Sequence, residues 1–151
     1  MIRIATPQDA IAVAQLAVQM WTSGTEAELA AEFESLMAKP DAVIFLYDVG
    51  SESIGFAQCQ LRRDYVEGTE TSPVGYLEGV FVKKAYRNRG YGKALVSACE
   101  GWATEQGCAE FASDCQLDNL QSLAFHLHSG FAEANRIICF TKKLSLSAEK
   151  R

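Results

Sequence analysis

Residues 87–93 read Arg-Asn-Arg-Gly-Tyr-Gly-Lys, and they stand between an apolar run at 79–82 and a helical pattern that begins at Tyr91. A strand, a short basic and glycine-rich loop and a helix start together favour phosphate binding, because free N–H groups at a helix N-terminus carry partial positive charge. Gly90 and Gly92 let the backbone approach an anion without interference from a Cβ atom. The loop therefore predicts a ligand with a phosphate or pyrophosphate group.

The spacing of this loop excludes two common nucleotide motifs. It lacks the Gly-x4-Gly-Lys-Ser/Thr pattern of a Walker A loop, and it has two glycines where the dinucleotide fingerprint has three. A plainer interpretation also exists, in which the loop is an ordinary strand-to-helix turn with solvated basic side chains. The loop by itself leaves both interpretations open.

The length and composition indicate one soluble domain. The chain has 151 residues, of which 48% are hydrophobic and 22% charged, so one core can form. No apolar stretch approaches the ~18 residues that span a bilayer, and the N-terminus lacks the pattern of a signal peptide. The five cysteines and two histidines show no metal-site spacing, so we expect free thiols in a cytoplasmic protein without a metal. The net charge of −5 argues against nucleic acid as a partner and suits a cationic substrate, although many proteins with neutral substrates are equally acidic.

The hydrophobic periodicity predicts strands and helices along the whole chain. Strands are expected at 1–5, 42–49, 54–62, 74–82, 110–113, 131–134 and 136–144. Helices are expected from a cap at Thr6 to about 21, from a cap at Thr25 to about 38, from 91 to a stop at Gly107, and from 120 to 129. The order of elements is therefore βααβββαβαββ.

A second signature follows the phosphate loop. Residues 119–131 read Asn-Leu-Gln-Ser-Leu-Ala-Phe-His-Leu-His-Ser-Gly-Phe, which matches the pattern Asn-x-x-Ser/Ala…Tyr-x-x-x-Gly-Phe except at the tyrosine. Together with the Arg/Gln-x-x-Gly-x-Gly/Ala form of the loop, it resembles the GCN5-related N-acetyltransferases (the GNAT superfamily), whose element order is the same. The resemblance implies an α/β fold, a central mixed sheet flanked by helices. Residues 1–144 would form the single domain and 145–151 a frayed C-terminal tail.

Three further stretches resemble a narrower group, the bacterial aminoglycoside 6′-N-acetyltransferases. They are Asp-Tyr-Val-Glu-Gly-Thr-Glu-Thr-Ser-Pro-Val at 64–74, Leu-Glu-Gly at 77–79, and residues 107–114. The resemblance implies transfer of an acetyl group from acetyl-coenzyme A to the 6′-amine of an aminoglycoside such as kanamycin or tobramycin, and hence antibiotic resistance. It also implies direct attack in a ternary complex without an acyl-enzyme, and a homodimer, in which the C-terminal segment could pair across subunits.

The resemblance assigns the donor site to backbone groups. The pantetheine arm of the coenzyme would lie along the backbone of Val80, Phe81 and Val82 like an added strand. The residues expected to hold the pyrophosphate are Asn88, Arg89, Gly90, Tyr91, Gly92 and Lys93. Asn119 is expected to hydrogen-bond the coenzyme arm.

A polycationic acceptor needs carboxylates and flat walls. Glu78, before Gly79 in the central strand, and Asp114, at the end of the next strand, are expected to bind substrate ammonium groups and to help remove the proton through water. Glu78 could instead pair with a structural arginine, and Asp114 could be a turn residue. Trp21 and Tyr65 are candidate walls for the sugar rings, with core packing as the alternative for Trp21. The carboxylates that could deepen the negative field, or simply be solvated, are Asp64, Glu67, Glu70 and Asp118.

Two positions depart from the family pattern. The tyrosine that serves as general acid in the wider superfamily is replaced by His126, which could protonate the departing thiolate or could be a surface histidine. The antibiotic-modifying relatives carry a glutamate where this chain has Asn135, a candidate substrate contact. The loss of that carboxylate weakens the expected hold on a polycation.

Three functional hypotheses follow. The first is an aminoglycoside 6′-N-acetyltransferase in the cytoplasm that uses acetyl-coenzyme A and no metal, with no nucleic-acid or membrane partner. The second, favoured by Asn135, is an acetyltransferase for another amine, such as a polyamine, an amino sugar or a peptide N-terminus. The third is a non-catalytic module that binds acyl-coenzyme A as a sensor.

Overall fold

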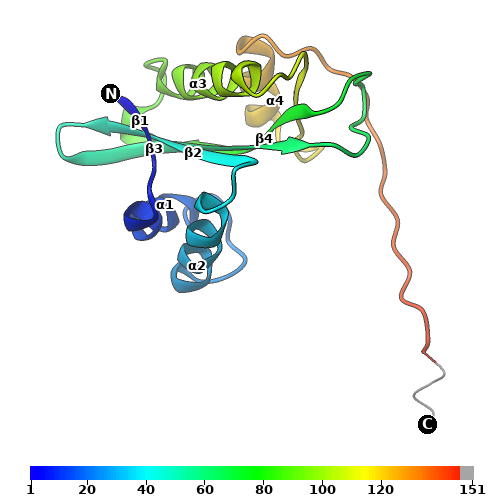
Figure 1. Ribbon diagram of the computed structural model, residues 1–151, viewed down its shortest axis with the longest axis horizontal. Coiled ribbons are helices and arrows are strands. Elements are labelled where there is room, and N and C mark those ends of the chain that lie inside the picture. The colour runs from blue at the N-terminus through cyan, green and yellow to red at the C-terminus, as the bar shows by residue number, and fades with distance from the viewer. Residues whose placement is uncertain (147–151) are drawn as a thin grey trace.

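The computed structural model describes residues 1–146, which form a central sheet with helices on both faces (Figure 1). The strands are β1 (Ile2–Ile4), β2 (Ala42–Val49), β3 (Glu52–Arg62), β4 (Val74–Val82) and β5 (Phe111–Ser113). The α-helices are α1 (Ala10–Ala17), α2 (Glu26–Met37), α3 (Tyr91–Glu105) and α4 (Leu120–His128), and the 3-10 turns are η1 (Pro7–Asp9) and η2 (Lys84–Tyr86). Helices α1 and α2 lie on one face of the sheet, and α3 and α4 lie on the other.

The sheet has the order β1-β2-β3-β4-β5. Neighbouring strands are antiparallel except for β4 and β5, which run parallel. The parallel pair needs a crossover, and α3 supplies it on one face of the sheet. The predicted α/β fold with a mixed sheet flanked by helices is therefore confirmed.

Alternating side chains along β2 divide the core between the two faces of the sheet. Ile44 and Leu46 pack with α1 and α2, whereas Val43 and Phe45 pack with α3, because successive strand residues point to opposite faces. Phe56 is fully buried in the first of these clusters. Each helical layer is thus fixed to the sheet by its own apolar cluster.

The predicted caps begin the first two helical segments. The Thr25 hydroxyl accepts from the Glu28 N–H at 3.1 Å, and the Glu28 carboxylate accepts from the Thr25 N–H at 2.8 Å, which completes a capping box for α2. Thr6 caps the turn η1, where its N–H donates to Asp9 at 2.8 Å. The helix predicted to reach about residue 21 ends earlier, at Ala17.

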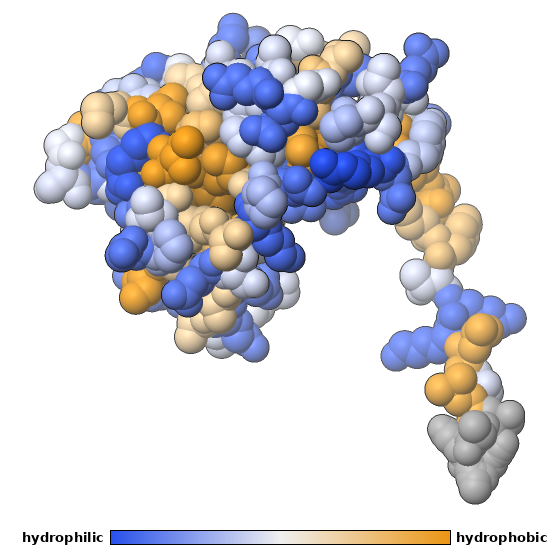
Figure 2. All heavy atoms as spheres, in the orientation of Figure 1, coloured by the Kyte–Doolittle hydropathy of each residue, from blue (hydrophilic) through white to orange (hydrophobic). Residues whose placement is uncertain are grey.

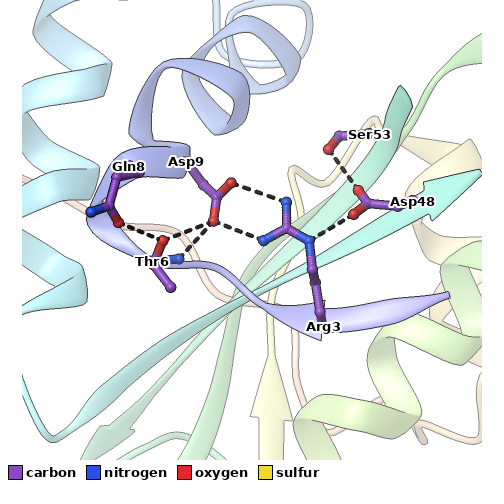
Figure 3. Close-up of polar contacts among 6 residues, drawn as sticks. All are labelled: Arg3, Thr6, Gln8, Asp9, Asp48 and Ser53. Atoms are coloured by element: carbon purple, nitrogen blue, oxygen red, sulfur yellow. Dashed lines mark hydrogen bonds and ion pairs between the residues drawn. The ribbon is translucent and has the colours of Figure 1, made fainter. Parts of the chain in front are cut away.

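An arginine joins the first strand to the first helical turn and to β2 (Figure 3). Arg3 donates from Nη1 to Asp9 at 2.9 Å and from Nε to Asp48 at 2.6 Å. Asp48 also accepts from the Ser53 hydroxyl at 2.6 Å. The hydrogen bond from Arg3 lowers the pKa of Asp9 from 3.8 to about 2. This network ties the N-terminus to the edge of the sheet.

The two strands predicted for the C-terminal segment are wrong. Residues 131–134 and 136–144 contain no strand. The chain stays in contact with the body through Phe131 and Asn135, and after that it runs away from the body (Figure 1). A strand exists only when a neighbouring strand accepts and donates its backbone hydrogen bonds. The apolar pattern of this segment is present, but no strand of the same chain pairs with it within residues 1–146. The tail predicted at 145–151 lies mostly outside the described residues, since the structure ends at 146.

None of the helices within residues 1–146 combines the length and the apolar character that a bilayer crossing requires.

The ion-pair network predicts an acid-sensitive contribution to stability. Asp9 has a lowered pKa in the folded chain, so its contribution is present above its unfolded pKa near 3.8 and is lost as the pH falls toward about 2. We expect Asp9→Asn to lower the free energy of unfolding at pH 7 by about 1 kcal/mol, a value reduced because Arg3 is partly exposed. Urea unfolding at pH 7 and pH 2.5 measures the effect, which should shrink at the lower pH. An equal loss at both pH values would contradict the ion-pair explanation.

Candidate active site

A β-bulge at Glu78 interrupts the centre of the sheet. In the pairing of β3 with β4, Gln58 faces Gly79 and Cys59 faces Leu77, so Glu78 has no opposite residue. A bulge of this kind redirects the side chain of the extra residue and bends the strand. Glu78 is therefore displaced from the regular alternation of β4 at the point where a functional carboxylate was predicted.

The sheet opens on the other side of the same position. Strand β5 pairs with β4 only through Gly75, Tyr76 and Leu77, and β5 ends at Ser113. Residues 78–82 of β4 therefore have no strand partner on that side in the part of the chain that the structure describes. Their backbone groups can accept an extended ligand as an added strand. The predicted donor residues Val80, Phe81 and Val82 lie along this edge.

The glycine-rich loop at 87–93 follows this open edge after the short turn η2. Arg87 Nε donates to the Val82 carbonyl at 2.7 Å, so its guanidinium fastens the loop to the end of β4. Asn88 and Gly90 both have positive φ angles, 64° and 84°, which turn the chain sharply into helix α3. The N–H groups of the first helical turn then have no partners within the helix and can bind an anion.

The side chains of the loop divide into inward and outward groups. The Tyr91 ring lies 4.5 Å from the Tyr47 ring, centroid to centroid, so it packs into the core and leaves only its backbone for a ligand. Arg89 and Lys93 are exposed and contribute charge. A Cβ atom at Gly92 would lie 3.0 Å from the Phe125 ring, so this glycine lets α4 pack closely against the loop.

Asn119, predicted to contact the coenzyme arm, caps helix α4. Its Oδ1 accepts from the Ser122 N–H at 3.0 Å, so the side-chain amide nitrogen remains for a ligand. The helix that it starts lies on the same face of the sheet as α3.

The two predicted acceptor carboxylates form one polar cluster with residues of β3 and β4. Arg62 Nη2 donates to Glu78 Oε1 at 2.9 Å, and Arg62 Nε donates to Oε2 at 3.2 Å. The Tyr76 hydroxyl donates a short hydrogen bond to Asp114, and the Arg62 guanidinium carbon lies 3.5 Å from the Tyr76 ring centroid. Glu78 and Asp114 are thus brought together as predicted, and the alternative of an arginine partner for Glu78 is also present.

Burial governs the titration of this cluster. Partial burial raises the pKa of Glu78 above its ordinary value, although the hydrogen bonds from Arg62 act in the opposite direction. Burial, followed by the hydrogen bond to Asp114, raises the pKa of Tyr76, so this phenol stays protonated at neutral pH. A carboxylate with a raised pKa is a better proton acceptor than an ordinary one.

A cavity of about 250 Å³ lies beside Glu78, between the sheet and helix α2. Its lining residues are Trp21, Leu29, Glu32, Phe33, Leu36, Gln58 and Glu78. Trp21 packs against Gly79 so closely that a Cβ atom there would lie 2.5 Å from the indole. Trp21 packs against Phe33, as the alternative of core packing predicted, and it also lines the cavity, so its role as a wall for sugar rings stays a prediction.

The loop at 63–73 carries the other predicted wall, Tyr65, which is 76% exposed. The carboxylate of Glu110 fixes this loop by accepting from the N–H groups of Glu70 at 2.9 Å and Thr71 at 2.8 Å. Asn135 Nδ2 donates to Glu67 at 2.9 Å, so the loop also contacts the start of the C-terminal segment. Asn135 therefore holds the carboxylate of Glu67 in place.

His126 lies with both ring nitrogens engaged. Its Nδ1 is 2.7 Å from the Ser122 carbonyl, which can only accept, so this nitrogen carries a proton. Its Nε2 is 2.9 Å from the Ser113 hydroxyl, and Ser113 Oγ is 3.2 Å from the Leu77 carbonyl. His126 therefore reaches the point where β4 and β5 separate through Ser113.

Arg62, Tyr76, Glu32 and Ser113 were missed in the sequence. Tyr76 gave no clear signal, because the bulge at Glu78 breaks the regular alternation of β4 and the Tyr76 contact with Asp114 joins residues 38 positions apart. Arg62 and Ser113 gave no local signal, since their contacts join residues of different strands. Glu32 lies in a regular helix pattern, where a carboxylate is usually solvated.

The comparison with known proteins agrees with this geometry. The model of the acetyltransferase (GNAT) family matches residues 10–131. The chain is 41% identical to an aminoglycoside N(6′)-acetyltransferase type 1 of Stenotrophomonas maltophilia over 147 residues, 97% of this chain and 95% of the relative. It is 39% identical to a protein of the same name from Acinetobacter haemolyticus, over 86% of this chain and 89% of the relative.

Solved structures show the same fold. The crystal structure of an aminoglycoside antibiotic 6′-N-acetyltransferase from Acinetobacter haemolyticus superposes with a TM-score of 0.91 at 36% identity, over 96% of this chain and 99% of that one. A structure of AAC(6')-Iy with a bisubstrate analogue, CoA-S-monomethyl-acetylneamine, has a TM-score of 0.90 at 33% identity, over 95% and 98%. The chain belongs to the acetyltransferase (GNAT) family, as its two sequence motifs predicted.

The loop geometry predicts a coenzyme-binding defect at Gly90. A Cβ atom there would meet no atom of residues 1–146 within 4 Å, so a side chain would project into the open space in front of the helix N-terminus. We expect Gly90→Val to weaken coenzyme A binding at least about tenfold, because the valine crowds the anion and strains a backbone with positive φ.

Isothermal titration calorimetry with coenzyme A measures this effect. Gly101→Val is the matched control, since Gly101 also has no atom within 4 Å of an added Cβ but lies on the exposed face of α3. Equal affinities for the two variants would remove the loop from the donor site.

Proposed function

We propose that this chain transfers an acetyl group from acetyl-coenzyme A to the 6′-amine of aminoglycosides, by direct attack within a ternary complex. One observation carries the proposal. The unpaired edge of β4, suited to the donor, and the carboxylates of Glu78 and Asp114, suited to a cationic acceptor, lie at the same break in the sheet. The names of the relatives at 41% and 39% identity point to the same acceptor.

The donor is held by charge and by backbone hydrogen bonds. We infer that the pyrophosphate lies on the N–H groups between Asn88 and Lys93, and that the pantetheine arm follows Val80–Val82. AAC(6')-Iy, similar in fold, has been solved in complex with coenzyme A. Holding the thioester along a rigid strand aligns its carbonyl carbon for attack.

The acceptor is held by carboxylates and activated by one of them. Glu78 and Asp114 attract the ammonium groups, while Trp21 and Tyr65 face the sugar rings. An amine attacks only after it loses a proton, and Glu78, whose burial raises its pKa, is suited to accept that proton through a water molecule. The free amine then adds to the thioester carbonyl, and the C–S bond breaks to release the thiolate of coenzyme A.

The departing thiolate needs a proton or a positive partner. His126 is the candidate acid. Its contact with Ser113 at 2.9 Å connects it to the fork between β4 and β5, the point beyond Leu77 and Ser113 where the two strands separate. When Nε2 is protonated it donates to Ser113 Oγ, which frees the hydroxyl proton for another acceptor. In this proposal the proton moves through Ser113 and does not pass directly from the ring to sulfur.

A second acceptor class is favoured by Asn135. An amide here does not add the negative charge that a glutamate would, and it holds Glu67 at 2.9 Å instead. When asparagine stands at this position in place of glutamate, a smaller amine with less positive charge, such as a polyamine or an amino sugar, would lose less binding affinity than an aminoglycoside.

Release of free thiol from acetyl-coenzyme A tests the proposal. We expect turnover with kanamycin or tobramycin and little with spermidine, and we expect Asp114→Ala to lower kcat/KM for the aminoglycoside about 100-fold while coenzyme affinity is unchanged. Glu100→Ala, which removes the same charge from the exposed face of α3, should leave kcat/KM within about threefold.

Each alternative result identifies a different function. Turnover with spermidine alone would support the second acceptor class. Tight coenzyme binding without turnover of any amine would support a sensor. Wild-type kcat/KM in Asp114→Ala would remove this carboxylate from the acceptor site.

We also propose that the chain works as a homodimer in the cytoplasm, where free thiols persist. All five cysteines are free, which suits a reducing compartment. The dimer proposal is supported by the C-terminal segment, in which Ile137, Ile138, Phe140, Leu144 and Leu146 are between 62% and 88% exposed. Figure 2 shows this segment as apolar and polar side chains outside the body of the molecule.

Most of the segment alternates in the manner of a half-buried strand. Ile138, Phe140, Leu144 and Leu146 share one face, which Lys142 interrupts, and Thr141, Lys143 and Ser145 share the other face with Ile137 and Cys139. Strand β5 is the edge of the sheet within the described residues. An apolar strand without a neighbour and a sheet edge without a neighbour fit together between two copies of the chain, as in strand exchange.

Substitutions on opposite faces of the segment test the dimer. Phe140→Lys should convert the protein from dimer to monomer, because it removes an aromatic side chain from the more apolar face and adds a second charge beside Lys142. Thr141→Lys on the other face should leave the dimer intact. Light scattering coupled to size-exclusion chromatography measures the mass of each variant. A monomeric wild type, or the same mass for both variants, would contradict strand exchange.

A further inference from the structure

Arg62 contacts both halves of the acceptor cluster at once. The edge of its guanidinium faces Glu78, with two donor–acceptor distances of 2.9 Å from Nη2 and one of 3.2 Å from Nε. Its flat face lies on the Tyr76 ring, 3.5 Å from the guanidinium carbon to the ring centroid. Tyr76 in turn donates its hydroxyl proton to Asp114. One side chain therefore fixes Glu78 directly and Asp114 through Tyr76.

The chemistry of this contact requires an arginine. A guanidinium is planar and presents parallel N–H groups along its edge, so it can bind a carboxylate and stack on an aromatic ring at the same time. A lysine ammonium carries the same charge but can do only one of these with good geometry. A lysine would supply the same positive charge, but it would not make both the contact with the carboxylate and the contact with the ring.

Stability alone does not account for a cation in this place. The Arg62 side chain is 40% exposed, and ion pairs with an exposed partner contribute little to folding. A fixed positive charge beside Glu78 also repels the ammonium groups that the acceptor brings. The next residue, Arg63, forms an ion pair at 2.6 Å with Asp41, which lies outside the cluster. An arginine at this end of β3 can therefore form an ion pair without contacting Glu78.

We propose that Arg62 is a positioning residue of the acceptor site. It orients Glu78 directly and Asp114 through Tyr76, and its hydrogen bonds favour the ionised form of the Glu78 carboxyl group. The inference rests on the proposed acetyl transfer to a cationic amine. A carboxylate has about four lone-pair sites, and Arg62 uses the side of Glu78 that faces it, so the other side remains for an ammonium group or a water molecule.

The charged and titratable groups around Glu78 set the expected direction. They are Arg62 on β3, Tyr76 on β4, Asp114 after β5 and Glu32 on α2, which lines the same cavity. Burial raises the pKa of Glu78, Asp114 raises it further, and only Arg62 among these groups lowers it. Removal of Arg62 therefore leaves the upward effects unopposed, and the carboxyl group stays protonated to a higher pH.

Three variants test the proposal through the pH dependence of kcat/KM for the aminoglycoside. With Arg62→Ala we expect the acid limb to move upward by about one pH unit, so that kcat/KM at pH 6 falls at least about tenfold and the loss shrinks at pH 8.5. In Arg62→Lys we expect the acid limb of the pH profile to lie where it does in the wild type, whereas the KM for the acceptor should remain higher than in the wild type. Arg63→Ala, which removes the same charge from the next residue, should leave the profile unchanged.

A purely structural role predicts a different result. A residue needed only for folding would lower kcat/KM by the same factor at every pH, and that outcome would overturn the proposal. An unchanged acid limb in Arg62→Ala would overturn it as well.

A measurement without turnover separates this inference from the proposed function. The carboxyl carbon of Glu78, assigned in the ¹³C NMR spectrum with Glu78→Gln, can be titrated in the wild type, Arg62→Ala and Arg63→Ala. We expect its midpoint to rise in Arg62→Ala alone. An inactive wild type would refute acetyl transfer to aminoglycosides, whereas an unmoved Glu78 midpoint in Arg62→Ala would refute the role of Arg62.

Discussion

The bulge at Glu78 is the constraint on which the rest of the site depends. One extra residue in β4 removes Glu78 from the register with β3, and immediately beyond it β4 loses its other neighbour, because β5 ends at Ser113. The first effect presents a carboxylate, and the second exposes the backbone edge that leads to the phosphate loop. If β4 had regular hydrogen bonds along both of its edges, the open backbone edge would be covered and Glu78 would return to the ordinary alternation of side chains. Donor and acceptor features therefore meet because the sheet is imperfect at one residue.

Most of the fold could be predicted because its signals are local. The caps at Thr6 and Thr25, the apolar run of β4 and the glycine-rich turn into α3 each specify a conformation within a few residues. The C-terminal strands could not be predicted correctly, since alternation says that a segment can pair but not where its partner is. At 138–146 the alternation holds except at Cys139 and Lys142, and the described chain offers no neighbour for it. The alternation that led to the incorrect prediction of two strands within one chain supports the proposal that this segment pairs with a strand of a second copy.

The candidate site was predictable to the extent that its parts are contiguous in sequence. The loop at 87–93 and the carboxylates next to recognisable motifs could be named from the chain alone. Arg62 and Tyr76 could not, because their contacts join residues 16 and 38 positions apart and depend on the β3–β4 and β4–β5 pairings. His126 illustrates a further limit: its position was identified, but only the structure shows that it reaches the fork through Ser113. Sequence patterns identify residues, whereas their hydrogen-bond partners belong to the fold.

A fixed arginine and a cationic acceptor beside the same carboxylate are compatible for an electrostatic reason. Without Arg62, burial would raise the pKa of Glu78 with less opposition, and a neutral carboxyl neither attracts an ammonium group nor accepts its proton. The positive charge of Arg62 weakens the attraction of the site for a cation. The same side chain strengthens that attraction by favouring the ionised carboxylate of Glu78. Arg62 is 40% exposed, so water screens its repulsion of an ammonium group, whereas its hydrogen bonds act directly on a Glu78 carboxylate that is only 18% exposed. In the proposed mechanism, such a contact favours the charged form of the base before the acceptor arrives.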